Sequence, residues 1–140
     1  MSVKKIGMAF RKLVLILLVL SVLILINPRT VKADIAGGKW GTCTWTITNN
    51  GTLTIGAGTG ANTGYKNAPW YNNRYSIKSI NTSGKVVLPQ NCSYLFYGLS
   101  KVENIDMSGF DTTHVSDMSY MFSNCLSLTS LKVSMFNTKT

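Results

Sequence analysis

The chain has 140 residues, 45% of them hydrophobic, and a formal net charge of +9. This length leaves room for one domain of ordinary size. Six of the fourteen Lys and Arg residues precede residue 34, so residues 34–140 keep eight basic and five acidic side chains, a balance of +3. This mild charge contains no basic cluster or stripe, whereas a nucleic-acid partner requires one. We therefore predict no nucleic-acid binding.

The first 33 residues have the pattern of a secretory signal peptide. A basic head precedes the apolar run Leu13–Ile26, and Val31–Ala33 offers the small residues that a signal peptidase requires. The alternative is an uncleaved anchor, but fourteen residues are short of the roughly 20 that a spanning helix needs. We expect cleavage between Ala33 and Asp34, and a secreted or cell-surface protein that meets the membrane only during export.

Residues 34–88 are expected to form a small β-rich region. Residues 34–38 are interpreted as a short flexible lead, and a hairpin follows it. Two short strands, Ser76–Ile80 and Lys85–Leu88, are then expected on either side of Ser83-Gly84.

The hairpin is predicted over Thr44–Ile55, where apolar and polar residues alternate around Asn-Asn-Gly. A three-residue loop places Ile47 opposite Leu53 and Trp45 opposite the last residue of the segment, so the apolar side chains share one face. A two-residue loop would put them on opposite faces. The longer loop also gives its glycine the left-handed position that such loops require.

Large aromatic residues frame this front region. Trp40, Trp45, Trp70 and Tyr71 are expected to form a small aromatic core, and the alternative for the same rings is a carbohydrate-stacking platform. The glycine-rich stretch 56–64 resembles a phosphate-binding loop in composition only, because no helical pattern follows it.

An internal repeat of 26 residues organises the second half of the chain. Such self-similarity is typical of coils stacked along an axis. Ile105 and Leu131 are therefore expected on short strands that lie side by side, and residues 117–123 are expected to form a short helix after the N-cap Ser116. The positions identical to the residue 26 places later are Ser93, Tyr94, Phe96, Ser108, Phe110 and Thr112.

Polar residues alternate with the inward positions of these strands and are the candidate partner-binding face. The alternative is an ordinary solvated sheet face without a partner. The candidate residues are Asn104, Asp106, Ser108, Ser130, Lys132 and Ser134.

Cysteines and histidines are too few for a metal or catalytic site. Three cysteines give no disulfide framework: a bridge between Cys43 and Cys92 is one possibility, and Cys125 is interpreted as a small buried hydrophobe. With a single histidine, His114, and no Cys-x-x-Cys, we predict no metal and no cofactor. The absence of Gly-x-Ser-x-Gly and the placement of the acids at repeat positions argue against an enzyme.

The run Phe110–Val133 closely resembles the repeat of the BspA-like leucine-rich-repeat surface proteins of bacteria. The resemblance implies a mostly β fold with short helices, in which the region 34–88 precedes a leucine-rich-repeat solenoid of about two repeats over residues 89–140. Because the array stops in mid-repeat, we expect an N-terminal fragment of a longer protein. The matching positions are Phe110, Asp111, Thr112, Val115, Met118, Met121, Phe122, Cys125, Leu128 and Leu131.

The same resemblance implies an exported bacterial surface protein without catalytic residues, which acts as a binding or adhesion module. Its partner is then an extracellular protein, the matrix or a cell-wall glycan, bound at the polar strand face. The alternative function is a structural spacer or stalk that presents another domain.

Overall fold

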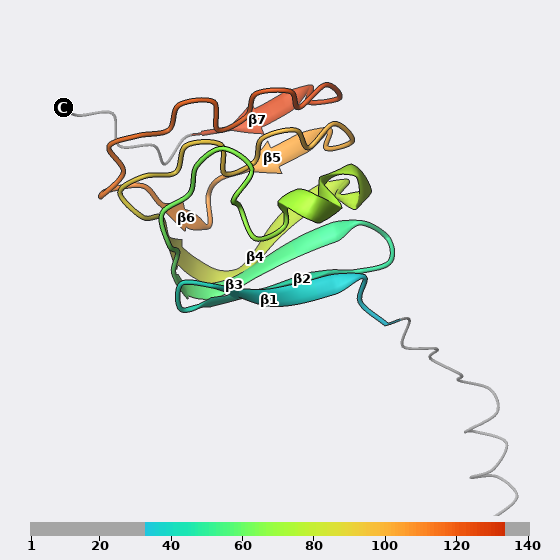
Figure 1. Ribbon diagram of the computed structural model, residues 1–140, viewed down its shortest axis with the longest axis horizontal. Coiled ribbons are helices and arrows are strands. Elements are labelled where there is room, and N and C mark those ends of the chain that lie inside the picture. The colour runs from blue at the N-terminus through green and yellow to red at the C-terminus, as the bar shows by residue number, and fades with distance from the viewer. Residues whose placement is uncertain (1–32, 134–140) are drawn as a thin grey trace, which may run out of the picture. The chain divides into compact units, whose positions relative to one another are not determined.

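Residues 33–133, the part of the chain that this computed structural model describes, consist mainly of β-strands and turns (Figure 1). The helical element there is the 3-10 helix η1 (Tyr71–Ser76). Within this range no helix has the length and apolar character needed to cross a membrane. The strands are β1 (Ala36–Trp40), β2 (Cys43–Ile47), β3 (Thr52–Thr59), β4 (Ser79–Val87), β5 (Asn104–Asp106), β6 (Phe110–Asp111) and β7 (Ser130–Lys132).

The predicted hairpin is confirmed in its position and its register. In the antiparallel pair of β2 and β3, Ile47 lies opposite Leu53 and Trp45 lies opposite Ile55. Gly51 has a φ of +87°, the left-handed conformation expected for the glycine of the loop. The apolar side chains of both strands consequently point to one side and form the start of the core.

The predicted flexible lead over residues 34–38 is wrong, because the chain already forms β1 there. This strand pairs along its whole length with β2, with Trp40 opposite Cys43. The turn between them has two residues and begins with Gly41, at a φ of +61°. A single polar and glycine-rich strand carries no apolar alternation, so no periodic pattern predicts it.

From β3 onwards the strands run parallel and the chain winds into a β-solenoid of about three turns. β3 pairs with β4 and β4 with β6 in one ladder, while β5 pairs with β7 in a second ladder. Figure 1 shows the coils following one another from β1 at one end to β7 at the other. Ile105 lies directly opposite Leu131, which confirms that the 26-residue repeat places equivalent residues on adjacent parallel strands.

The two strands predicted on either side of Ser83-Gly84 form one continuous strand, β4, so the predicted turn is wrong. Between the pairs Gly56/Ser83 and Gly58/Val86, β4 contains one residue more than β3, and Gly84 has a φ of +127°. Glycine adopts this conformation readily, and the extra residue forms a β-bulge. The glycine therefore bends the strand without reversing it.

The predicted helix over residues 117–123 is also wrong, because this segment is a series of turns. Tyr120 has a φ of +57°, which interrupts a right-handed helix. Backbone carbonyls of the segment accept hydrogen bonds from the preceding coil, at 2.8 to 3.0 Å, instead of from amides of their own helix. The donor and acceptor pairs are Cys92 and Asp117, Tyr94 and Ser119, Phe96 and Met121, and Gly98 and Ser123.

Three of the four residues of the predicted aromatic core, the tryptophans, are buried, which excludes a tryptophan stacking platform on the surface; Tyr71 is only partly buried and packs against this core. Trp40, Trp45 and Trp70 are buried, and the Trp70 ring has its centroid 5.5 Å from that of Trp40 and 6.1 Å from that of Trp45. Phe96 stacks on Trp70 with centroids 5.9 Å apart. A single buried core therefore continues from the antiparallel strands into the parallel coils, on both sides of residue 88.

The three cysteines are free thiols, so the possible bridge between Cys43 and Cys92 does not form. Burial raises the pKa of Cys92 to about 12, which keeps this thiol neutral and unreactive. Cys125 packs against the core but is only partly buried.

Apolar side chains of the last described coil are less buried than their equivalents one coil earlier. Leu131 is 38% exposed where Ile105 is 2% exposed, and Val133 is 39% exposed where Met107 is fully buried. The expectation that Leu131 lies inside, like Ile105, is therefore wrong. Within these residues, β7 has a neighbouring strand on one side only.

Candidate functional site

The structure brings together most of the residues of the predicted polar strand face. Asn104 and Asp106 on β5 lie opposite Ser130 and Lys132 on β7, and all four are exposed. Ser108 follows β5 and is also exposed. Ser134 lies outside the described residues. We call the five described residues the polar strand face.

Charges on the polar strand face neutralise each other. Lys132 Nζ lies 3.1 Å from Asp106 Oδ2, and the Ser108 amide donates a hydrogen bond of 2.8 Å to Asp106 Oδ1. Hydrogen bonds from the Ser108 amide and hydroxyl and from Lys132 lower the pKa of Asp106 to about 2. The carboxylate is consequently ionised and paired at neutral pH. An exposed pair of this kind adds little stability, so it is available to a partner at low cost.

A groove with a volume of about 630 Å³ adjoins the polar strand face at Ser108. It lies along β4 and β6 and along the Ser108-Gly109 connection that leads from β5 to β6. Its lining includes Thr82, Lys85, Ser108, Phe110, Asp111 and Thr113. Ser108 belongs both to the predicted face and to the groove, so the two form one continuous surface.

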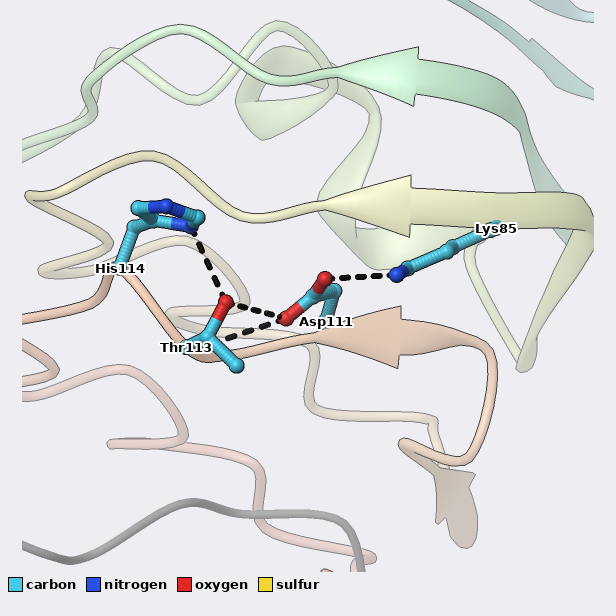
Figure 2. A network of polar contacts seen from close by, with 4 residues as sticks. All are labelled: Lys85, Asp111, Thr113 and His114. Atoms are coloured by element: carbon cyan, nitrogen blue, oxygen red, sulfur yellow. Dashed lines mark hydrogen bonds and ion pairs between the residues drawn. The ribbon is translucent and has the colours of Figure 1, made fainter.

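A network of polar side chains, three of which line this groove, is shown in Figure 2. Lys85 Nζ on β4 lies 2.8 Å from Asp111 Oδ2 on β6. The amide and the hydroxyl of Thr113 donate to Asp111 Oδ1 at 3.0 and 2.7 Å. His114 Nδ1 lies 3.0 Å from the same hydroxyl. Since the single hydroxyl hydrogen goes to Asp111, His114 Nδ1 must be the donor to Thr113 Oγ1.

The network holds a carboxylate below the rim of the groove and a cation at the rim. The side chain of Asp111 is 16% exposed, whereas that of Lys85 is 72% exposed. Hydrogen bonds from Lys85 and then from Thr113 hold the pKa of Asp111 well below its ordinary value. The carboxylate is thus saturated by its own neighbours, and the groups offered to a ligand are the Lys85 ammonium and the hydroxyls along the groove.

Acid should destabilise the fold through Asp111. Its pKa is lower in the folded than in the unfolded chain, so its contribution to stability is complete above the unfolded pKa of about 4 and is lost as the pH falls further. We expect Asp111→Asn to lower the melting temperature at pH 7 and to make it less sensitive to pH between 5 and 2. Melting curves of the wild type and the variant test this. Parallel pH profiles of the two proteins would contradict it.

The sequence did not predict the groove, because two of its walls come from strands that are not related by the 26-residue repeat. Val86 of β4 pairs with Phe110 of β6, 24 residues later. The segment that could have located the groove is Phe110-Asp111-Thr112. Its repetition in the sequence indicates a repeat motif, whereas in the structure its first two residues form the edge strand β6, with the polar Asp111 beside the groove. Within residues 33–133, no group of three or more side chains gathers that could hold a metal ion.

Comparisons with known proteins give a family for the chain. No curated protein and no solved structure matches it. A family model described as "Mycoplasma protein of unknown function, DUF285" matches residues 61–140, more than half of the chain and the part that contains β4 to β7 and the groove. The chain therefore belongs to the DUF285 family of Mycoplasma proteins.

Proposed function

We propose that the protein is an exported surface protein that binds an extracellular partner through the polar strand face and the adjoining groove. One observation carries the proposal: exposed polar side chains are fixed in register on adjacent strands and lead at Ser108 into a groove of about 630 Å³. Proteins of the matched family are surface-associated and have no established function. The predicted signal peptide and the BspA-like resemblance add support for export and adhesion.

The chemistry of the surface favours binding over catalysis. Its carboxylates, Asp106 and Asp111, are each held in an ion pair with a lysine and are ionised at neutral pH. A general acid requires a carboxyl group with a raised pKa, which is the opposite shift. Rigid β-strands that present paired charges and hydroxyls are suited to hydrogen bonding with a protein, matrix component or glycan.

A structural spacer is the second candidate. Hydrogen bonds link the backbones of neighbouring coils, and this regular stacking along one axis favours a stalk. A spacer needs no partner on its polar surface, so the two candidates differ in the effect of surface substitutions.

The test measures binding of the full chain to immobilised extracellular matrix and to intact cells. We expect Lys85→Gln and the double variant Asp106→Asn/Lys132→Gln each to weaken binding by at least roughly tenfold, because a charged contact contributes about 1.5 to 3 kcal/mol. All three side chains are exposed. The double variant should therefore change the melting temperature at pH 7 little, whereas Lys85→Gln should lower it, because this variant removes the cation paired with Asp111, whose side chain is only 16% exposed.

Lys101→Gln is the matched control, because Lys101 is an exposed lysine outside both the polar strand face and the lining of the groove. It should bind like the wild type. If the groove variant and the face variant both bind as tightly as the wild type, the proposed surface is refuted. The absence of any binding by the wild-type chain would favour the spacer.

A further inference from the structure

A second hollow, of about 250 Å³, lies beside η1 on a surface distinct from the polar strand face and its groove. Its walls are the rings of Tyr71, Tyr75 and Tyr97 and the side chain of Leu126, and its polar groups come from Arg74 and Asn124. Tyr75 is 57% exposed and Leu126 is 81% exposed. Large apolar groups exposed together mark interaction sites more often than isolated ones do.

The cation in this hollow is held in a fixed position. The guanidinium carbon of Arg74 lies 4.1 Å from the ring centroid of Tyr71 and 4.1 Å from that of Tyr75. Nη1 donates to the Tyr71 carbonyl at 3.0 Å and Nη2 donates to the Tyr75 hydroxyl at 2.8 Å. These two bonds leave three of the five guanidinium N–H donors without a partner among residues 33–133. No Asp or Glu lines the hollow in this part of the chain.

The opposite wall is also preorganised. Tyr97 stacks on Tyr71 with ring centroids 6.3 Å apart, and its hydroxyl accepts a hydrogen bond of 2.9 Å from Asn124 Nδ2. Tyr94 packs its ring edge against Tyr97, at 5.4 Å. Asn124 has a φ of +61°, a left-handed conformation that Asn tolerates better than most residues. Its side-chain oxygen faces no partner within the described residues and is an acceptor for a ligand hydroxyl.

We propose that this tyrosine-lined hollow binds a single carboxylated sugar unit of an extracellular glycan. The apolar C–H face of a pyranose ring packs on exposed tyrosine rings, and its hydroxyls require the acceptor and donor groups that Asn124 and the tyrosines supply. Arg74 binds the carboxylate, because a guanidinium forms charge-assisted bonds with it. A volume of about 250 Å³ is below the range of drug-sized ligands and is suited to one sugar unit.

The experiment is a titration of the full chain with four small probes, followed by ligand-observed saturation-transfer NMR. Two probes are acidic sugars, glucuronic acid and N-acetylneuraminic acid. The third is glucose, which has the sugar ring but no carboxylate. The fourth is the α-amide of N-acetylglutamate, which has a carboxylate but no sugar ring. We expect at least one acidic sugar to bind with a dissociation constant on the order of millimolar and at least roughly tenfold more tightly than glucose and the amide. The preference between the two acids identifies the kind of glycan.

Two variants locate the site, and one serves as the control. Tyr75→Ala removes an exposed ring of the hollow, and Asn124→Asp places a negative charge there while keeping a residue that tolerates the left-handed backbone. Each should weaken acidic-sugar binding roughly tenfold. Tyr120→Ala removes a ring that is 62% exposed and lies outside the hollow, so it should leave binding unchanged.

Three results would overturn the proposal. The first is no saturation transfer to either acidic sugar. The second is equal binding of glucose or of the amide, since the hollow would then recognise a ring or a carboxylate alone. The third is acidic-sugar binding that neither variant weakens, because the sugar would then bind elsewhere. Melting curves of the variants show whether each is folded. If Tyr75→Ala does not fold, Asn124→Asp alone decides the location.

Discussion

Phe96→Ala is expected to lower the free energy of unfolding by about 3 to 5 kcal/mol, the cost of truncating a large core aromatic residue. Phe96 is fully buried and joins the antiparallel and parallel parts of the core. Its ring stacks on Trp70 and Phe122, with centroids 5.9 Å away in both cases, and meets the edge of Phe110 at 6.0 Å. Equilibrium unfolding of the full chain in urea measures the loss.

The repeat supplies the control for this substitution. Phe122 occupies the position equivalent to Phe96 one coil later, and it is only partly buried. Phe122→Ala removes the same atoms from a less enclosed site, so we expect a smaller loss, about 1 to 3 kcal/mol. Equal losses for the two variants would contradict the gradient of burial from the inner to the outer coil.

Gly41→Ala is expected to cost about 2 to 5 kcal/mol, because it combines backbone strain with a clash. Gly41 has a φ of +61°, where an L-residue with a side chain pays roughly 1 to 2 kcal/mol. A Cβ at this position would also lie 2.2 Å from the Thr59 carbonyl oxygen and 2.9 Å from the Ala61 amide nitrogen. Both are backbone atoms that cannot rotate away, and such overpacking typically adds 1 to 3 kcal/mol.

Gly64→Ala provides the comparison for the same change elsewhere. A Cβ on Gly64 would meet nothing closer than the Asn67 side chain at 3.9 Å. This variant should unfold within about 0.5 kcal/mol of the wild type in urea, as surface substitutions usually do. No loss at Gly41, or a loss there no larger than at Gly64, would contradict the close approach between the first turn and the end of β3.

Local patterns were sufficient to predict the elements whose side chains alternate or repeat. The alternation around Asn-Asn-Gly correctly predicted that Ile47 faces Leu53, and the 26-residue period correctly predicted that Ile105 faces Leu131. The aromatic core around Trp70 followed from the size of the rings. In each case burial of apolar surface determines the register, and burial leaves a periodic trace in the sequence.

The errors arose where contacts between coils decide the local conformation. Helical spacing near Met118 and Met121 reflects turns that pack on the preceding coil, and four backbone carbonyls of residues 117–123 accept hydrogen bonds from amides of that coil. Gly84 is typical of a turn in the sequence, but parallel pairing of β4 with β3 makes it part of a β-bulge. The strand β1 has exposed glycines and a lysine at its centre, pairs with β2 and contributes a single buried side chain, Trp40, so it has no apolar alternation.

The surfaces proposed for binding differ in how far the sequence predicts them. The predicted face depends on one period and could be read from the sequence, whereas the groove joins Lys85 to Asp111 across β4 and β6. The tyrosine-lined hollow joins η1 to turns of two coils. Sites that are assembled from segments at unequal sequence separations form no motif in the sequence, so their residues can be identified only in the folded chain.

The rings of Tyr94 and Tyr120 stack with centroids 4.9 Å apart, close to the distance between neighbouring strands of a sheet. These two tyrosines, which are 26 residues apart, therefore lie about one strand spacing apart on successive coils. If the chain binds a polymeric ligand as proposed, a ligand whose units advance by a similar step would place one unit beside each coil. A ligand with a different step would lose this correspondence after a few units, so the proposed binding would favour a partner whose repeat matches the spacing of the coils.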